Sequence, residues 1–292
     1  MVVQHTEAFS QQQPLLFSIA YRMLGSVAEA EDIVQETFLR WQQTEGEDVR
    51  SPKSYLSTIA TRLCIDQLRS ARAQREEYIG PWLPEPLTTE HIPPMDDKLA
   101  LADSLSMAFL LLLETLAPTE RAVFLLREVF DYDYAEIANI VEKSESNCRQ
   151  ISRRARQRVA DRQPRFDVAS EEVARMMERF LHAATTGDMN GLLSLLADDA
   201  TLWSDGGGKV VAAVNPIRGA DNITRFFLGL LKKAPPGFAV RLASINEQPG
   251  IITYVNGRPQ SAGTFDVIDG KIHAVRVVVN PDKLRHVPPL KP

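Results

Sequence analysis

Apolar residues recur at helical spacing through most of the N-terminal half of the chain and at alternating positions near its C-terminal end. Leu15 and Ile19 lie about one helical turn apart, on one face of a first predicted helix. The same spacing predicts further helices over residues 28–43 and 53–76. We therefore expect residues 1–79 to form a helical domain.

Residues 80–98 interrupt the helical pattern. They contain five prolines, which exclude a regular helix or central strand. We interpret this segment as a linker between two domains. Trp82 and Leu83 are unusual in a solvated linker, and two interpretations stay open: they cover a local apolar patch, or they dock on another domain.

Residues 99–163 are helical again and contain two helices separated by a short polar turn. Ser144 is the predicted N-cap of the second helix, in which Cys148, Ala155 and other apolar residues form one buried stripe. Polar side chains dominate the remaining surface of this helix: Arg149, Gln150, Arg153, Arg154, Arg156 and Arg158. Guanidinium groups bind phosphates and guanine edges, so the pattern is typical of a helix-turn-helix that enters a major groove.

The pattern changes within residues 168–285. An amphipathic helix over residues 170–188 and a short helix are followed by alternating apolar positions. Five strands are predicted, over residues 201–205, 240–245, 251–255, 263–268 and 271–279. Asn256-Gly257 and Asp269-Gly270 are expected to form hairpin turns. Helices followed by antiparallel strands indicate an α+β domain, with residues 286–292 as a tail.

Composition changes this picture in one respect. The chain has 292 residues, 44% hydrophobic, with a net charge of −5, which argues against indiscriminate binding to nucleic acid. Residues 144–165 nevertheless hold seven arginines against two acids, Glu145 and Asp161. We expect a DNA contact that is confined to the second helix of the helix-turn-helix.

Cysteine usage and hydropathy exclude several classes of protein. Cys64 and Cys148 are isolated, without a CxxC motif or a nearby histidine pair, so we predict reduced core residues and no metal site. No cofactor is predicted. The N-terminus lacks a signal-peptide pattern and no apolar run is long enough to span a bilayer, so the predicted location is the cytoplasm, with no membrane contact.

Three segments resemble bacterial RNA polymerase sigma factors. AEAEDIVQETFLRWQ (28–42) resembles region 2.2, and YLSTIATRLCIDQLRSAR (55–72) resembles regions 2.3–2.4. LAPTERAVFLLREVFDYDYAEIANIV (116–141), with the arginine-rich helix after it, resembles regions 4.1–4.2. The chain has no room for a region 1.1 or a folded region 3, which indicates the extracytoplasmic-function (ECF) group.

The C-terminal part resembles a SnoaL-like domain of the NTF2-like fold. WLPEP (82–86), DGGGK (205–209) and NPDKL (280–284) look like the marks of ECF sigma factors with a fused SnoaL-like extension. The implied fold class is multi-domain. Two all-α sigma domains, a region 2 helical bundle and a region 4 helix-turn-helix, precede an α+β NTF2-like cone with a curved antiparallel sheet.

The resemblance implies promoter-specific transcription initiation together with core RNA polymerase. Region 4 would read the −35 element and contact the β flap, and region 2 would recognise and melt the −10 element. The implied −35 contacts are Arg149, Gln150 and Arg153 to bases and Arg154, Arg156 and Arg158 to phosphates. The implied −10 contacts are Arg62, where many relatives have asparagine, beside a flipped base, and Arg69, Arg72 and Arg75 at phosphates. The alternative for these last three arginines is a charged helix end that suits the helix dipole.

An acidic face of region 2 has two interpretations. Its residues are Glu31, Asp32, Gln35 and Glu36. Helical spacing alone is typical of a solvated surface, whereas the resemblance implies a contact with the β′ clamp of polymerase. Charge complementarity there would set register and encounter rate more than affinity.

The function of the third domain leaves alternatives open. We predict regulation in cis, through contacts among Trp82, Leu83, Pro84, Asp205, Gly206, Gly207, Gly208, Lys209, Asn280, Pro281, Asp282 and Lys283. The alternative for the three glycines is an ordinary hairpin loop.

No catalytic constellation is recognisable among the candidate proton carriers His182, Asp199, Trp203, Asp205, Asp266, His273 and Arg276. We therefore predict no enzyme. Two alternatives are a sigma factor whose SnoaL-like domain binds a small molecule or has an enzymatic activity, and a helix-turn-helix repressor.

Overall fold

The computed structural model describes residues 2–44, 49, 51–76, 78–88, 105–161 and 170–290, with the side chains of 2–5, 71–76 and 170 excepted. The chain divides into two compact units. The first comprises Met1–Glu76, Pro93–Leu105 and Phe109–Gln163, and the second comprises Glu77–Ile92, Ser106–Ala108 and Pro164–Pro292. The proline-rich segment expected to be a separate linker thus belongs, over residues 77–92, to the C-terminal unit.

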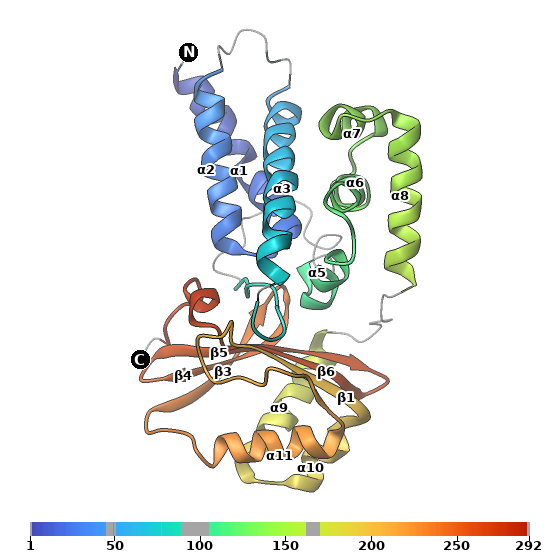
Figure 1. The fold of residues 1–292 in the computed structure, drawn as a ribbon. Helices are drawn as coiled ribbons and strands as arrows, with labels where there is room; N and C mark the ends of the chain where they lie inside the picture. Colours follow the sequence, from blue (N-terminus) through green and yellow to red (C-terminus); the bar gives the residue numbers. More distant parts are fainter. Residues whose placement is uncertain are drawn as a thin grey trace. The chain divides into compact units, whose positions relative to one another are not determined.

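Three long helices open the first unit (Figure 1): α1 (Val2–Leu24), α2 (Val27–Gln42) and α3 (Pro52–Glu76). Leu16, Met23 and Leu56 are fully buried among them. Burial of such side chains contributes roughly 1.5–3 kcal/mol each before entropy is counted. Ser26 begins α2, because its side chain accepts a hydrogen bond from the Glu29 backbone N–H.

The helix-turn-helix lies in the same unit, within α6 (Pro118–Glu128), α7 (Tyr134–Val141) and α8 (Glu145–Ala160), which follow α5 (Met107–Leu113). The predicted N-cap of α8 is confirmed, since the Ser144 side chain accepts from the Asn147 backbone N–H. Cys148 and Ala155 are buried as expected. Ser152 completes the buried stripe, whereas Ile151 is only half-buried.

Polar contacts fix the two helical sets of the first unit against each other. The Ser57 and Tyr132 hydroxyls, both buried, are 2.7 Å apart and share a hydrogen bond. Arg121, 3% exposed, donates to the backbone carbonyl of Met23 and pairs with Glu114 at 2.8 Å. A buried guanidinium that lost these partners would leave an unpaired charge, so both contacts specify the packing of α6.

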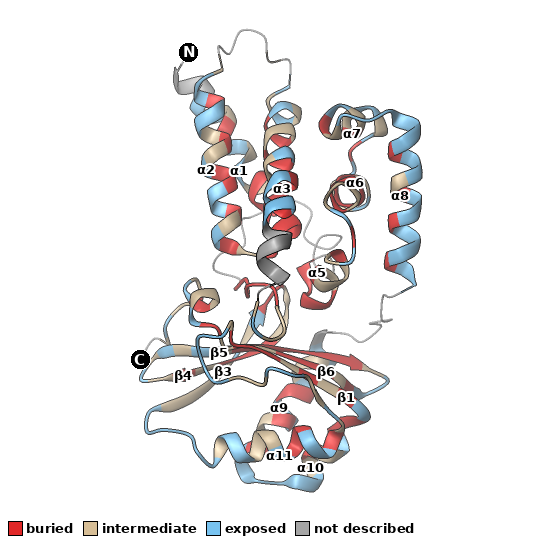
Figure 2. Cartoon of the chain, viewed as in Figure 1, coloured by how far each residue is buried: buried red, intermediate tan, exposed pale blue. Residues whose placement is uncertain are grey.

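The second unit is a curved six-stranded sheet with helices on one face (Figure 1). Its helices are α9 (Ser170–Thr186), α10 (Met189–Leu195) and α11 (Ala220–Leu231). Its strands are β1 (Leu196–Asp205), β2 (Ile217–Arg218), β3 (Phe238–Ile245), β4 (Gln248–Val255), β5 (Arg258–Ile268) and β6 (Lys271–Val278), ordered β2-β1-β6-β5-β4-β3. Figure 2 shows buried positions on α9 and along the sheet, where Met177, Phe180 and Val275 belong to one core.

Both predicted hairpin turns are confirmed. Asn256 and Asp269 have φ values of 50°, and the following glycines, Gly257 and Gly270, also lie at positive φ, the geometry of a two-residue hairpin. One pair departs from the expected antiparallel sheet: β1 runs parallel to β6, so the sheet is mixed. This pair is possible because the long connection from β1 through the other strands allows β6 to return beside it.

Three elements of the second unit were not predicted. Helix α11 and the short strand β2 lie between the first two predicted strands, and a 3₁₀ helix, η3 (Pro281–Leu284), follows β6. Ile223, Phe226, Phe227 and Leu231 recur in α11 at helical spacing, so its apolar stripe packs against the core of this unit. Within the described ranges, no helix is long and apolar enough to cross a membrane.

Candidate functional site

The buried carboxylate of Asp205 binds the segment 77–92. Asp205 ends β1 and is fully buried. Its Oδ1 accepts from the Tyr78 hydroxyl at 2.5 Å, and its Oδ2 accepts from the Leu83 backbone N–H at 2.8 Å and from Lys283 Nζ at 2.8 Å. Charge-assisted hydrogen bonds of this kind are about twice as strong as neutral ones.

Lys283 of the NPDKL motif completes this contact. Its Nζ also donates to the Leu83 carbonyl at 2.6 Å, and it lies over the Trp82 ring at 4.4 Å and the Tyr78 ring at 5.0 Å. The Lys283 side chain is 13% exposed, so solvent screens its pair with Asp205 weakly. The ammonium therefore meets a carboxylate, a carbonyl and two aromatic faces.

Asn280 connects the two motifs. Its side-chain Nδ2 donates to the Tyr78 hydroxyl at 3.1 Å, and its backbone N–H donates to the Asp205 carbonyl at 2.9 Å. Burial, followed by the hydrogen bond to Asp205, raises the pKa of Tyr78, which keeps the phenol neutral and able to donate. We call Asp205, Asn280 and Lys283, with the linker residues Tyr78 and Leu83 that they hold, the linker clamp.

The glycines of DGGGK allow the linker to approach closely. Gly207 has φ +57°, and a Cβ there would overlap the Asn280 side-chain amide and lie 2.9 Å from the Tyr78 hydroxyl. A Cβ on Gly208, at φ +69°, would meet Ile79 at 2.9 Å. Lys209, 52% exposed, forms an ion pair with Asp282, which solvent screens.

A second contact, which the sequence did not predict, holds the other end of the linker. The Leu87 backbone N–H donates to Asn246 Oδ1 at 3.1 Å, and the Asn246 backbone N–H donates to the Leu87 carbonyl at 2.7 Å. Leu83 and Leu87 are each 2% exposed, and Pro84 between them is buried. The only local signal was Asn246 in the polar turn between two strand-like runs, where it has φ +55°.

The arginines of α8 fall into two groups. Arg149 pairs with Glu145 at 3.1 Å and lies over the Tyr134 ring, and Arg156 pairs with Glu128 at 2.8 Å. The second group is exposed and makes no hydrogen bond or ion pair with any described residue. It consists of Arg153 and Arg154, together with the neighbouring Gln150. These side chains are available to an external ligand.

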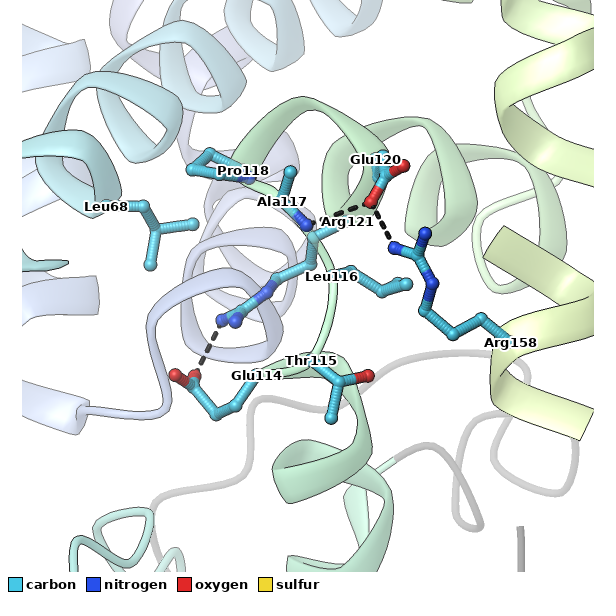
Figure 3. Close-up of a pocket in the computed structure, with 9 residues that line it drawn as sticks. All are labelled: Leu68, Glu114, Thr115, Leu116, Ala117, Pro118, Glu120, Arg121 and Arg158. Atoms are coloured by element: carbon cyan, nitrogen blue, oxygen red, sulfur yellow. Dashed lines mark hydrogen bonds and ion pairs between the residues drawn. The ribbon is translucent and has the colours of Figure 1, made fainter. Parts of the chain in front are cut away.

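A polar cavity of about 350 Å³ lies beside the N-terminus of α6 (Figure 3). Arg158 of α8 pairs with Glu120 at 2.7 Å, and Glu120 also accepts from the Ala117 backbone N–H. Across the cavity, Arg121 pairs with Glu114. The Arg158–Glu120 pair therefore orients α8 on α6.

The residues expected at the −10 element have different environments. Arg62 donates to the carbonyls of Ile140 and Asn139 at 2.9 and 2.8 Å and pairs with Glu142 at 2.9 Å. It therefore caps the C-terminal end of α7, where a cation suits the helix dipole. Arg69 pairs with Asp66 on its own helix at 3.2 Å. Arg72 lies in α3, and its side chain is outside the described residues.

On α2, the residues expected to contact polymerase share the outer face. Glu31, Asp32 and Gln35 are exposed, and Glu36 is half-buried and pairs with Arg40 at 2.8 Å. The acidic face is thus accessible within this unit.

The candidate proton carriers of the second unit do not converge on one site. Arg276 and Asp266 form a buried ion pair at 2.5 Å, with Trp203 5.5 Å from the guanidinium. His273 lies 3.8 Å from the exposed Asp199, and His182 is exposed on α9. Arg276 and Asp266 thus pair with each other on the sheet, and His182 and His273 are not part of this ion pair.

Comparisons with known proteins cover nearly the whole chain. Family models match Sigma-70 region 2 at residues 8–74, Sigma-70, region 4 at residues 106–159 and SnoaL-like domain at residues 177–275. The ECF RNA polymerase sigma factor SigJ of Mycobacterium tuberculosis is 38% identical over 306 residues, covering 99% of this chain and 95% of SigJ. The probable ECF RNA polymerase sigma factor SigI of the same organism is 29% identical over 279 residues, covering 95% and 93%.

The structural comparison agrees with the sequence comparison. The crystal structure of SigJ from Mycobacterium tuberculosis superimposes with a TM-score of 0.74 and 35% sequence identity, over 96% of this chain and 97% of that one. The fold is therefore that of a sigma-70-type protein with regions 2 and 4 and a C-terminal SnoaL-like domain. The chain belongs to the ECF RNA polymerase sigma factors.

Proposed function

We propose that this protein directs core RNA polymerase to promoters by reading the −35 element with α8 and opening the −10 element with α3. The observation that carries the −35 half is the exposed group Gln150, Arg153 and Arg154, which has no partner among the described residues. Arginine and glutamine each form paired hydrogen bonds to a base, worth about 1–3 kcal/mol in discrimination. Arg149 and Arg156 would join this surface when DNA replaces Glu145 and Glu128 as their ion-pair partners.

The acidic face of α2 is the proposed contact with the β′ clamp, and the helix-turn-helix unit is the proposed contact with the β flap. Glu31, Asp32 and Gln35 present two carboxylates and an amide on the exposed side of α2. Such a face suits a basic partner surface. We propose that the protein acts in the cytoplasm, together with polymerase and promoter DNA.

Opening the −10 element requires a change within the first unit. Arg62 is the proposed neighbour of a −10 base, yet its guanidinium is committed to the end of α7. Contact with DNA would therefore replace two carbonyls and Glu142 by phosphate or base acceptors. We infer that α3 and α7 separate when the promoter is engaged.

Regulation in cis is the proposed role of the C-terminal unit. The segment 77–92 lies between regions 2 and 4 in sequence, and the linker clamp holds it at Tyr78 and Leu83. Asn246 holds it again at Leu87. A tethered contact acts at a high effective concentration, so these interactions can restrict the distance between regions 2 and 4.

We propose no catalytic role for the SnoaL-like domain. Asp266 and Arg276 pair with each other, and neither His182 nor His273 forms a hydrogen bond or ion pair with them in the part of the chain that the structure describes. A general acid or base needs a perturbed group in reach of substrate, and fold alone does not supply one.

Run-off transcription with purified core polymerase tests this function. Full-length protein should initiate at a subset of a promoter panel, and Asp205→Asn should change the amount of transcript without changing the promoters selected. Removal of residues 168–292 should change it further. If no promoter supports transcription, the sigma function fails; if both variants match the full chain, only regulation in cis fails.

A further inference from the structure

The second unit contains a cavity of about 650 Å³ between α9, α11 and the sheet. This volume is in the range of sites that enclose small organic molecules. Five phenylalanines contribute to its wall: Phe180, Phe226, Phe227, Phe238 and Phe265. The Phe180 ring lies edge-on to two of the others, 5.0 Å from Phe227 and 5.1 Å from Phe265, so much of the wall is aromatic.

The polar groups of this wall are few and uncharged in its interior. Thr253 and Ser261 share a hydrogen bond of 2.6 Å, which uses one of their two hydroxyl hydrogens and leaves the other for a ligand acceptor. Lys233 is the one charged residue among the lining side chains, and it is exposed. An ionised ligand would lose its hydration without a buried partner, whereas a neutral ring compound with one carbonyl would be satisfied.

Three of the candidate proton carriers, Trp203, Asp266 and Arg276, lie on the opposite face of the sheet. Trp203 and Arg276 alternate with the lining residues Ser204 and Val275, and Asp266 follows the lining residue Phe265. Successive side chains of a strand point to opposite faces. The wall therefore offers binding without an acid or base to transform the ligand.

Two strands connect the cavity directly to the linker clamp. Ser204 lines the cavity and the next residue, Asp205, binds the linker; Val279 lines it and the next residue, Asn280, binds Tyr78. The Val279 backbone N–H also donates to the Asp205 carbonyl at 2.8 Å. A ligand packed against Ser204 and Val279 would hold the two strand ends that carry the clamp.

We propose that this cavity binds a neutral, ring-containing apolar molecule with a hydrogen-bond acceptor, and that its binding strengthens the linker clamp. The coupling rests on the regulatory function proposed above, whereas the binding site does not. Coupling between two sites is reciprocal, so a weaker clamp must bind the ligand less tightly by the same factor.

The binding test uses full-length protein and the neutral fluorescent ketone 6-propionyl-2-(dimethylamino)naphthalene. We expect saturable 1:1 binding with blue-shifted emission. Val240→Phe places a ring into the cavity from β3 and should weaken binding at least about tenfold. Leu242→Phe is the matched control, because Leu242 lies on the same strand, is 39% exposed and does not line the cavity.

Thr253→Val keeps the shape of the wall and removes one hydroxyl, so it should weaken binding about threefold to tenfold while the fold is retained. Absence of saturable binding, or equal binding by Val240→Phe and Leu242→Phe, overturns the site.

The coupling test measures amide exchange of Leu83, whose N–H is bound to Asp205. Saturating probe should slow this exchange severalfold, and Asp205→Asn should weaken probe binding by a matching factor. Unchanged or faster exchange at Leu83, with binding intact, overturns the coupling and leaves the site standing. If Asp205→Asn leaves the amount of transcript unchanged while the probe still slows exchange at Leu83, only the regulatory function is contradicted.

Discussion

At the scale of single residues, the linker clamp depends on one buried carboxylate and one ammonium. Asp205 has no solvent exposure, so water cannot stabilise its charge. Hydrogen bonds from Lys283, Tyr78 and the Leu83 N–H stabilise the carboxylate instead. A buried pair contributes little when both partners are replaced but costs much when one is removed. Asp205 and Lys283 therefore specify a geometry more than they add stability.

Asp205→Asn should destabilise the full chain by about 3 kcal/mol, since it leaves the Lys283 charge without its anion. Lys283→Met should cost a similar amount. The double variant should cost less than the sum of the two, because neither buried charge remains. Chemical denaturation of all four proteins measures the coupling; strictly additive costs would contradict a direct Asp205–Lys283 interaction.

Gly207→Ala should loosen the clamp, because the added Cβ overlaps the Asn280 amide and φ +57° strains an alanine. Gly187→Ala is the matched control: Gly187 has φ +75°, and its Cβ would meet nothing within 4 Å. We expect Gly187→Ala to cost about 1 kcal/mol from the backbone alone and Gly207→Ala to cost more. Thermal unfolding compares them, and equal shifts would refute a steric role for Gly207.

At the scale of elements, α8 divides its arginines between the protein and an external ligand. Arg156 and Arg158 bind Glu128 and Glu120 of α6, which fixes how α8 lies on α6. Arg153 and Arg154 extend from the exposed face. Acids on α6 thus orient the recognition helix and leave Arg153 and Arg154 unpaired among the described residues, whereas Arg156 must leave Glu128 to meet DNA.

Arg153→Ala should weaken holoenzyme binding to the preferred −35 sequence by about 1–3 kcal/mol and reduce discrimination at one base pair. Arg154→Ala, a proposed phosphate contact, should weaken binding to all sequences alike and lower the salt dependence by about one unit of slope. Binding titrations over a set of −35 substitutions at several salt concentrations separate the two. Loss of affinity without loss of discrimination in Arg153→Ala would reassign it to phosphate.

Arg62→Ala should release the C-terminal end of α7, because the variant loses the guanidinium that binds the carbonyls of Asn139 and Ile140. Amides near this end, such as Lys143, should exchange severalfold faster. Arg69→Ala is the control on the same helix, since Arg69 pairs with Asp66 of α3. Equal exchange at Lys143 in both variants would show that Arg62 does not hold α7.

At the scale of the whole molecule, one segment of chain serves two purposes. The segment 77–92 joins regions 2 and 4 in sequence, and it folds as part of the C-terminal unit. Regulation in cis, as proposed above, would act on the sigma regions through the chain that connects them.

The linker between residues 78 and 88 should resist limited proteolysis in the full chain, because Leu83 and Leu87 are buried and their N–H groups are bonded. Asp205→Asn combined with Lys283→Met should make it cleavable, with cuts mapped by mass spectrometry between residues 78 and 88. Equal resistance in both proteins would mean that Asn246 and apolar burial suffice to hold the linker.

The sequence by itself determined the elements whose signals are local. Apolar periodicity placed the helices of the first unit, Ser144 marked the start of α8, and two Asx-Gly pairs marked hairpin turns. Helix α11 carried a comparable stripe, Ile223 to Leu231, but lay between two predicted strands, in a segment for which no element was predicted. The motifs themselves identified the family, since their order along the chain is a property of sequence.

Only the tertiary structure decided which of these groups meet. Tyr78, Asp205 and Lys283 are far apart in sequence, and neither period nor spacing states that one carboxylate joins them. Packing between distant segments likewise produces three further features: the contact of Arg62 with α7, the hydrogen bonds between Asn246 and Leu87, and the aromatic cavity. Local preferences fix the elements, whereas burial and the pairing of buried polar groups fix their partners.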